Sequence, residues 1–188
     1  MSLGYALRRI VEEYPLARLD PPAGHPLAAV IRKGAPDELR AALAPIDGPF
    51  LVKGSPGRGS RWAAIPWIAV FDPAVTTSAT RGYYLVYLFP AHREVVHLSL
   101  AQGTVAAIRS HGPAAAGAHL RASGAALNAA IALGSAGELP EGYEAAHIRG
   151  LTYDLPDLGD ERRLHRDLAA AVAAYRALRA RGGLDLPG

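Results

Sequence analysis

Hydrophobic side chains recur at helical spacing in two segments, one near each end of the 188-residue chain. Such spacing places them on one face of an amphipathic helix. In the first segment Ser2 can cap the helix and Pro15 is expected to end it, whereas the second helix is expected to span about residues 159–181. The apolar positions are Leu3, Leu7, Ile10, Val11 and Tyr14 in the first segment, and Leu164, Leu168, Val172, Tyr175 and Leu178 in the second.

The centre of the chain has the two-residue period of β-strands. Residues 83–89 are almost all aromatic or β-branched and are apolar on both faces, which is typical of a central strand. Apolar and polar side chains alternate over residues 95–100 after a short turn, so the two segments predict an antiparallel hairpin. Further extended segments are expected over residues 49–53, 62–71 and about 145–153.

Two further helical patterns complete the predicted fold. A short helix is expected around residues 37–43, and a longer one over about residues 104–133 with a break at Gly112 and Pro113. Together these elements predict an α+β fold in which a mostly antiparallel sheet is flanked by N- and C-terminal helices. We expect residues 1–188 to form a single domain, since no repeat and no long linker interrupts the pattern.

Composition narrows the functional classes. Half of the residues are hydrophobic, which indicates a globular protein, yet no apolar run approaches the roughly 20 residues of a membrane span. Arg8, Arg9, Glu12 and Glu13 interrupt the N-terminal apolar pattern, so no secretory signal is expected and the cytoplasm is the expected location. Cysteine is absent, which excludes disulfides and thiolate metal sites.

The positive charge is carried mainly by arginine. The net charge is +3, and Lys33 and Lys53 are the only lysines among the 20 basic residues. The planar guanidinium group of arginine matches phosphate oxygens and guanine edges. With a sequence pI near 9.4, the chain is compatible with a polyanionic partner.

The segment GSPGRGS, residues 54–60, matches a nucleotide-binding loop only in part. A phosphate-binding loop needs Lys and then Ser or Thr after its last glycine, and here Ser60 and Arg61 occupy those positions. The glycine spacing of a dinucleotide fingerprint, the histidine spacing of zinc hydrolases and the serine elbow of α/β-hydrolases are also absent from the sequence. We therefore expect no catalytic residues, no metal site and no cofactor, and we do not expect this chain to be an enzyme.

Glycine, basic and aromatic residues are interleaved between residues 53 and 84, which favours nucleic-acid binding. Glycine lets main-chain N–H groups approach an anion, while basic and hydroxyl side chains bind phosphates. Aromatic rings can stack on a base, a contact worth about 1–3 kcal/mol. The predicted DNA-binding residues are Lys53, Ser55, Gly57, Arg58, Ser60, Arg61, Thr77, Ser78, Arg81 and Gln102, and the predicted aromatic pocket consists of Trp62, Trp67, Tyr83 and Tyr84.

A purely structural role is the alternative for several of these residues. The glycine-rich segment could do no more than connect two strands, and Trp67 could pack in the core. Tyr83 and Tyr84 are adjacent in a strand and face opposite sides of it, so at least one of them is expected to pack inside.

Three sequence blocks within residues 50–103 resemble the N-terminal domain of McrB-like modification-dependent restriction proteins. They are GSPGRGSRWAAIPWIAVF at residues 54–71, TTSATRGYYLVYLF at 76–89 and LSLAQG at 98–103. Arg61 is an extra residue relative to the family pattern, and it makes the glycine-rich segment longer and more basic. The resemblance implies a specificity module that binds double-stranded DNA carrying a modification, for a restriction system of type IV. It also implies that a nuclease or GTPase module, in cis or in trans, is responsible for cleavage.

The kind of modification stays open at this point. An altered base such as methylcytosine would leave the duplex and stack in the aromatic pocket. A phosphorothioate would instead place its sulfur in a small apolar depression beside basic groups. A nucleotide- or protein-binding regulatory domain that does not recognise DNA is the alternative function.

Overall fold

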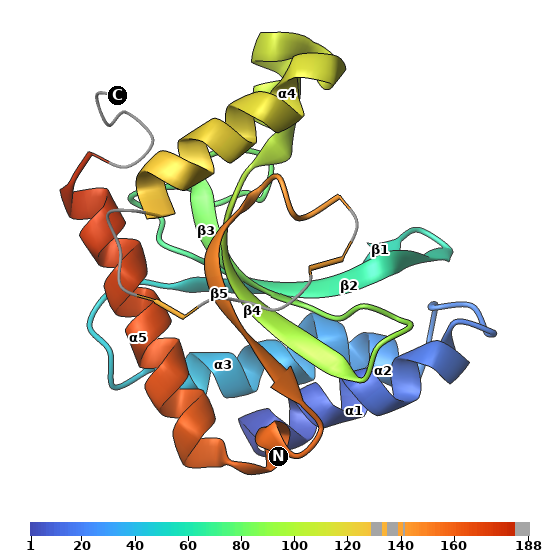
Figure 1. The fold of residues 1–188 in the computed structure, drawn as a ribbon. Coiled ribbons are helices and arrows are strands. Elements are labelled where there is room, and N and C mark those ends of the chain that lie inside the picture. Colours follow the sequence, from blue (N-terminus) through green and yellow to red (C-terminus); the bar gives the residue numbers. More distant parts are fainter. Residues whose placement is uncertain (129–132, 135–138, 141, 183–188) are drawn as a thin grey trace.

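Strand β3 (Tyr83–Leu88) lies at the centre of the fold, and all six of its residues are buried (Figure 1). The computed structural model describes residues 1–128, 133–134, 139–140 and 142–182. The remaining helices and strands are α1 (Leu3–Ala17), α2 (Pro26–Ala29), η1 (Val30–Gly34), α3 (Ala35–Leu43), β1 (Leu51–Arg58), β2 (Arg61–Phe71), β4 (Val95–Gln102), α4 (Thr104–Asn128), β5 (His147–Asp154), η2 (Asp157–Gly159) and α5 (Glu161–Ala180).

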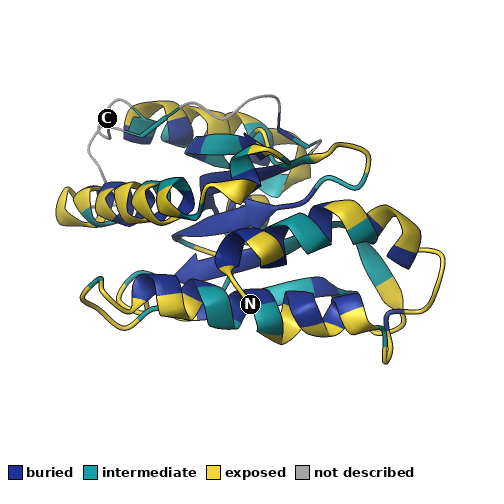
Figure 2. Ribbon diagram, turned by 90° about the horizontal axis from the view of Figure 1, so that it is seen from below, coloured by how far each residue is buried: buried dark blue, intermediate teal, exposed yellow. Residues whose placement is uncertain are grey.

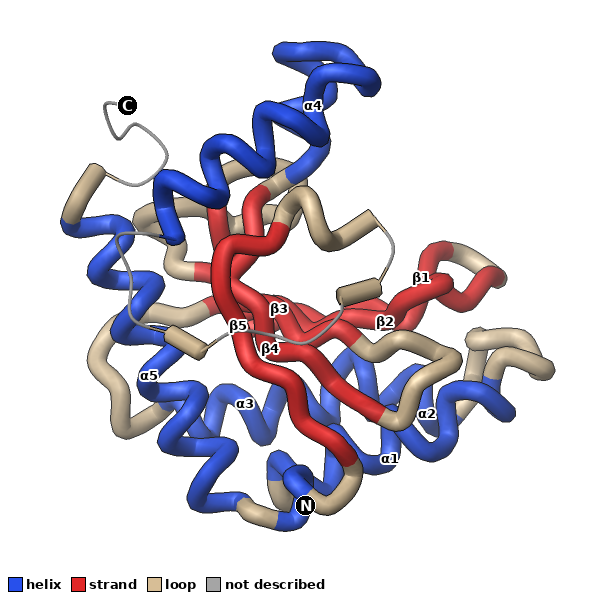
Figure 3. Tube along the Cα trace, viewed as in Figure 1, coloured by secondary structure: helices blue, strands red, loops and turns tan. Residues whose placement is uncertain are grey.

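The five strands form one antiparallel sheet in the order β1-β2-β3-β4-β5, so that each strand pairs with the next one in sequence (Figure 3). In the centre of the sheet, Val86 of β3 lies between Ala69 of β2 and Ser99 of β4. The predicted hairpin of β3 and β4 is confirmed by this register. The α+β fold class is confirmed as well, since helices precede and follow the antiparallel sheet.

One face of the sheet, here called the helix-covered face, packs against α1, α3 and α5. Figure 2 shows the buried strands between helices that are exposed on their outward sides. From β3, Tyr83, Leu85 and Tyr87 join the main hydrophobic core on this face, together with the fully buried Leu7 of α1 and Leu168 of α5. Burying one such side chain contributes about 1.5–3 kcal/mol, so this core is the main source of stability.

The opposite face of the sheet, here called the cavity face, carries a second and smaller apolar cluster. Tyr84, Val86 and Leu88 of β3 contribute to it, with Phe71 of β2 beside them. The ring centroids of Phe71 and Tyr84 lie 5.3 Å apart. Tyr143, which precedes β5, packs against this cluster from outside the sheet. The apolar residues on both sides of β3 are thus explained by packing on both faces.

Helix α1 begins as predicted but extends further. Ser2 caps it, because the Ser2 hydroxyl oxygen accepts a hydrogen bond from the main-chain N–H of Tyr5 at 3.3 Å. Pro15 does not end the helix, which continues to Ala17. Proline lacks an N–H group, but within the last turn this costs one hydrogen bond, and the N–H of Arg18 still reaches the oxygen of Tyr14 at 3.2 Å.

The segment between α1 and β1 is more helical than the sequence predicts. The expected helix around residues 37–43 is the end of a continuous helical stretch in which π-helical η1 joins α2 to α3. His25 caps this stretch by accepting the N–H of Leu27 on its Nδ1 atom at 3.1 Å. A π-helical segment shifts the hydrogen-bond spacing, and this change hides the helical period from sequence analysis.

Helix α4 bends sharply at Gly112, whose φ of 75° and ψ of 162° are not helical. The predicted break at Gly112 and Pro113 is therefore confirmed. The predicted continuation of this helix to about residue 133 lies mostly outside the described residues, which end with α4 at Asn128. Across the ranges that the structure describes, no helix combines the length and the apolar character needed to pass through a lipid bilayer.

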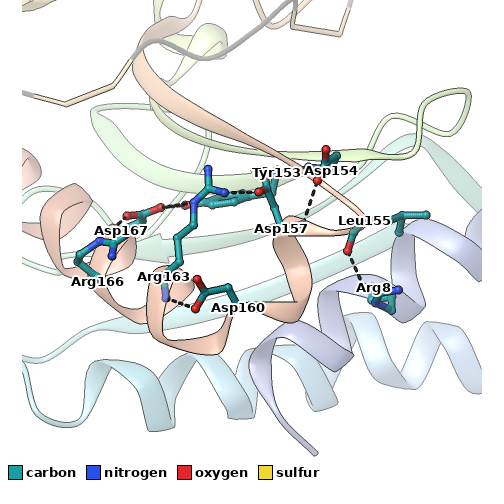
Figure 4. A network of polar contacts seen from close by, with 9 residues as sticks. All are labelled: Arg8, Tyr153, Asp154, Leu155, Asp157, Asp160, Arg163, Arg166 and Asp167. Atoms are coloured by element: carbon teal, nitrogen blue, oxygen red, sulfur yellow. Dashed lines mark hydrogen bonds and ion pairs between the residues drawn. The ribbon is translucent and has the colours of Figure 1, made fainter.

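A polar network attaches α5 to β5 at the end of the sheet near the N-terminus (Figure 4). Arg163 of α5 forms ion pairs with Asp157 and Asp167, and its guanidinium carbon lies 5.6 Å from the ring centroid of Tyr153 in β5. The Tyr153 hydroxyl donates to Asp167 at 3.3 Å. These contacts hold α5 against the helix-covered face of the sheet.

Gly54 shows how closely the helical layer approaches β1. A Cβ atom at this position would lie 1.7 Å from the main-chain oxygen of Ile31 in η1. No side chain can be placed there unless main-chain atoms move, so glycine at position 54 is required by packing.

Replacing Gly54 by alanine should therefore destabilise the fold strongly, because strand and helix would have to separate. We expect Gly54→Ala to lower the free energy of unfolding by about 2 kcal/mol or more in urea denaturation. Gly159→Ala is the matched control, since a Cβ atom there would lie 4.0 Å from Nη2 of Arg8, which is an ordinary van der Waals contact. Equal effects of the two substitutions would contradict this close approach.

Candidate nucleic-acid interface

The glycine-rich segment is a β-hairpin and not the loop that the sequence predicts. Strand β1 continues through Gly54 to Arg58, and only Gly59 and Ser60 form the turn before β2. Gly59 has a φ of 57°, a conformation that tight hairpin turns need and that glycine adopts without strain. Because the turn is so short, the neighbouring main chain pairs as strands.

An irregular register controls which way the hairpin tip faces. Ser55 pairs with Trp67, and Arg58 pairs with Arg61. These two pairs are three residues apart on β1 but six residues apart on β2, so the register shifts between them. In a regular strand Ser55 and Arg58 would face opposite sides, because side chains alternate. With the offset, the directly paired Arg58 and Arg61 share one face of the tip, and Arg58 lies over the cavity face.

Gly57 makes this offset possible. Its φ of 146° lies in the region that side chains avoid, and a Cβ atom here would be 2.1 Å from the main-chain oxygen of Arg61. The Ser55 hydroxyl donates to the main-chain oxygen of Gly57 at 3.5 Å across the same irregularity. Gly57 and Ser55, both predicted to bind DNA, therefore also shape the hairpin.

Two of the four aromatic residues predicted to line the pocket do not lie there, and both expectations are corrected. The Trp62 indole faces the helical layer, where its Nε1 donates to the main-chain oxygen of Asp20 at 2.6 Å and its ring meets Tyr14 edge-on. Tyr83 lies in the core on the helix-covered face, with its ring centroid 5.4 Å from that of Tyr175. Strand alternation sends both rings away from the cavity face.

The other two aromatic residues come together with distant residues around one cavity. This aromatic cavity has a volume of about 350 Å³ and lies on the cavity face, between the tip of the β1–β2 hairpin and the segment before β5. The Tyr84 hydroxyl donates to the main-chain oxygen of Ala79 at 3.2 Å, which fixes the ring. The residues that line the aromatic cavity include Arg58, Trp67, Thr80, Tyr84, Gln102 and Tyr143.

The electrostatics of the aromatic cavity combine neutral walls with a positive rim. Burial, and to a lesser extent the neighbouring Tyr143, raises the pKa of Tyr84 well above its usual range, so this phenol stays neutral at physiological pH. Arg58 is exposed at the rim, and Gln102 is buried. The arrangement can therefore hold a flat, uncharged ring inside while binding an anion outside.

The remaining predicted residues lie around the hairpin and the loop before β3, outside the lining of the cavity. The Lys53 ammonium group donates to the main-chain oxygen of Thr77 at 3.1 Å and so ties β1 to this loop. The hydroxyls of Ser78 and Thr80 are hydrogen-bonded to each other at 2.9 Å. The predicted residues that are exposed to solvent here are Lys53, Ser60, Arg61, Thr77 and Arg81.

Two further hollows have less of this chemistry. One of about 610 Å³ lies beside the β3–β4 turn, where Ile65, Arg93 and Pro140 contribute to its wall. The other, of about 190 Å³, lies in the bend of α4, where His111 and His119 stack with ring centroids 3.9 Å apart. Among the described residues, neither hollow is lined by a Tyr or Trp side chain. We therefore assign the candidate site to the aromatic cavity because of the aromatic side chains in its lining, although one of the other hollows is larger.

The family assignment follows from a comparison with known protein families. The family model described as the MrcB-like N-terminal domain matches residues 9–180, which include almost all of the elements described above. The chain belongs to this family. A search of curated proteins found no match. The MrcB-like assignment makes this a domain related to McrB and its restriction systems.

In this MrcB-like domain, Tyr143 is the aromatic residue of the cavity lining that sequence analysis missed. It lies in a loop between Gly142 and Glu144, half-buried, and its ring closes the aromatic cavity opposite the sheet. In the sequence, the signal that could have identified Tyr143 is that it is an isolated aromatic residue in a polar loop. Its partners lie more than 50 residues away in sequence, so no local pattern connects it to Tyr84 or Trp67.

Two histidines lie beside the cavity face between β4 and β5, where His97 is buried and His147 is partly buried. Nδ1 of His97 is hydrogen-bonded to the hydroxyl of Thr152 at 2.8 Å, and Nδ1 of His147 to the hydroxyl of Ser99 at 2.7 Å. Burial, with a smaller contribution from the charge of Arg93, lowers the pKa of His97 to about 4. Burial and then the proximity of His97 lower the pKa of His147 to about 4 as well. Both rings are therefore neutral in the folded protein at physiological pH.

This pair should make stability depend on pH in a defined window. In the unfolded chain histidine titrates near pH 6.5, so between about pH 6.5 and 4 the unfolded state binds protons that the folded state does not. The free energy of unfolding should fall as the pH is lowered through this window, by up to about 1.4 kcal/mol per pH unit for each histidine.

Urea denaturation at a series of pH values measures this slope. The control is the double variant His97→Gln, His147→Gln, in which the slope between pH 6.5 and 5 should flatten, since carboxylates titrate mainly below that range. An unchanged slope in the double variant would show that the two histidines titrate normally.

Proposed function

We propose that this domain recognises double-stranded DNA that carries an altered base and takes this base out of the duplex into the aromatic cavity. The observation that supports this most is that one cavity is lined by four residues of the binding site predicted from sequence, namely Arg58, Trp67, Tyr84 and Gln102. Its volume of about 350 Å³ lies in the range of cavities that hold small ligands, roughly 300–1,000 Å³. The family assignment supports a role in a restriction system.

The walls of the cavity suit a base that has left its stack. Trp67, Tyr84 and Tyr143 offer rings to a flat ligand, and stacking on such rings recovers about 1–3 kcal/mol per base. Flipping a base costs a few kcal/mol, so two stacking contacts and a hydrogen bond can offset it. The Trp67 ring is only partly buried in the free domain and is therefore available to a ligand.

The hairpin tip suits the phosphates next to such a base. Arg58 and Arg61 are paired across the hairpin on one face, and both are exposed. Lys53 lies on the same strand, with its ammonium group held by the loop before β3. Contacts of this kind position a duplex without reading its sequence, and they make binding salt-dependent.

The domain is proposed to supply specificity and not cleavage. No three His, Asp or Glu side chains gather as metal ligands in the part of the chain that the structure describes. We propose that a nuclease or GTPase module, in the same or a separate chain, acts on the DNA that this domain selects.

A binding screen against matched duplexes tests the proposal. The duplexes carry methylcytosine, hydroxymethylcytosine, methyladenine, a phosphorothioate or no modification, with 2-aminopurine beside the modified position. We expect tighter binding to one of the modified bases, accompanied by a rise in 2-aminopurine fluorescence as the neighbouring base leaves the stack. Preferential binding of the phosphorothioate without a fluorescence rise would mean that the backbone is recognised instead. Equal binding of all five duplexes would overturn the proposal.

The two tryptophans of β2 provide a matched pair of variants. Trp67→Leu removes a ring from the aromatic cavity and should reduce the preference for modified over unmodified DNA about ten-fold. Trp62→Leu removes a ring from the helical side and should leave this preference unchanged, although it lowers thermal stability. Fluorescence anisotropy with both duplexes measures the ratio for each variant.

Arg58→Ala separates phosphate binding from recognition of the modification. Because Arg58 lies at the rim, its loss should weaken binding to both duplexes alike and should reduce the slope of log affinity against log salt by about one. If Trp67→Leu weakened both duplexes to the same degree as Arg58→Ala, the cavity would not be the site of discrimination.

A further inference from the structure

The hollow of about 610 Å³ beside the β3–β4 turn, here called the arginine hollow, adjoins the aromatic cavity. Gly142 lines both spaces, whereas of the next two residues Tyr143 lines the aromatic cavity and Glu144 lines the arginine hollow. The loop that carries these residues therefore separates the two spaces. Ile65, in the wall of the arginine hollow, packs against the same apolar cluster as Tyr84, so both spaces open on the cavity face of the sheet.

The wall of the arginine hollow combines apolar surface with basic side chains. Arg18, which follows α1, and Arg93, in the β3–β4 turn, both contribute to it and are exposed to solvent. Among the residues that the structure describes, none forms an ion pair with Arg18. The apolar part of the wall comes from β2, the β3–β4 turn and the segment before β5, and it consists of Ala64, Ile65, Pro90, Ala91, Leu139 and Pro140.

The arginine hollow and the aromatic cavity are close enough to contact one DNA duplex. Tyr84 lines the aromatic cavity, and Pro90, six residues later in the chain, lines the arginine hollow. Six residues span at most about 22 Å even when fully extended. Because a duplex rises about 3.4 Å per base pair, this length corresponds to no more than about six base pairs. A duplex with one base in the aromatic cavity can therefore reach the arginine hollow within one helical turn.

We propose that the arginine hollow is a second contact site for the same DNA, in which Arg18 and Arg93 bind phosphates that Arg58 does not reach. The inference rests on the proposed function and deepens it, because it extends the contact with DNA beyond the modified base. Arg58 lines the aromatic cavity and is absent from the lining of the arginine hollow, so the two sites hold different phosphates. The apolar wall, with Ile65 and Pro90, can pack against the sugars between phosphates.

Glu144 provides a test of the charge of the ligand. Among the described residues that line the arginine hollow, Glu144 alone is acidic. Its carboxylate accepts a hydrogen bond from the main-chain N–H of Gly142 at 2.9 Å, which shapes the loop. The negative charge nevertheless lies beside the proposed phosphate and opposes its binding. Glu144→Gln keeps an oxygen as the acceptor and removes the charge, so DNA should bind about three-fold more tightly.

Arg18→Ala and Arg32→Ala form a matched pair of variants, since each removes one exposed arginine. Arg32 belongs to η1, whose neighbouring residues Val30 and Ile31 join the main core on the helix-covered face. We expect Arg18→Ala to weaken binding to the modified duplex about ten-fold and to lower the slope of log affinity against log salt by about one. Arg32→Ala should change neither quantity. Fluorescence anisotropy measures the affinities, and thermal denaturation checks that each variant is folded.

Neutral linkages in the DNA locate the phosphates. A methylphosphonate replaces one phosphate at a time on either strand of the modified duplex, up to about six nucleotides from the modified base. The wild-type domain should lose affinity at the phosphates that the arginine hollow binds. In Arg18→Ala the same replacements should have little effect, because that contact is already lost, and in Arg58→Ala a different set of replacements should lose its effect.

The outcomes separate this inference from the proposed function. If Arg18→Ala behaves like Arg32→Ala, if Glu144→Gln does not strengthen binding, or if Arg18 and Arg58 are coupled to the same phosphates, the second contact site is overturned while a preference for modified DNA can stand. If Arg18 is coupled to its own phosphates but modified and unmodified duplexes bind equally, the second contact site stands and the proposed function fails. Absence of DNA binding by the wild-type domain overturns both.

Discussion

Burial of β3 on both of its faces is the constraint on which the rest of the structure depends. A strand that is apolar on both sides needs a cover on each, and the two covers here are unequal. The helices α1, α3 and α5 close one side completely around residues such as Leu85 and Tyr87. On the other side, the described part of the cover consists of a hairpin tip, a loop and Tyr143, and these leave space above Tyr84. The aromatic cavity is the space that this incomplete cover leaves.

The β1–β2 hairpin places the positive charge of Arg58 on the cavity face of the sheet. Its tip is anchored by the Trp62 indole, which bonds to the loop after α1, so the tip is held by the helical layer and not by the sheet alone. The register offset then directs Arg58 toward the cavity while Trp62 faces away. One face of the β1–β2 hairpin thus anchors it through Trp62, and the other face carries Arg58. Because the hairpin is already held in place, it loses little conformational entropy when it binds a ligand.

The sequence predicted those parts of the fold that depend on local periodicity. The hairpin of β3 and β4, the bend at Gly112 and the amphipathic α5 each follow from patterns within about 20 residues. The parts that were mispredicted depend on contacts between distant segments. Gly54 was interpreted as a loop residue because its close approach to η1 cannot be seen in a one-dimensional pattern. The candidate site was predicted only in part for the same reason. Strand alternation separates Tyr83 from Tyr84, but no local rule places Tyr143 in the wall of the aromatic cavity.

The offset at Gly57 also limits how the length of this hairpin can vary. Each added cross-strand pair lengthens the ribbon by one residue per strand and turns its terminal side chains to the opposite face. A relative with a hairpin longer by one pair would present its terminal arginines to the helical layer, away from the aromatic cavity. A relative longer by two pairs would present them on the same face as here and about 7 Å further out. Hairpin length in related proteins should therefore change in steps of two residues per strand.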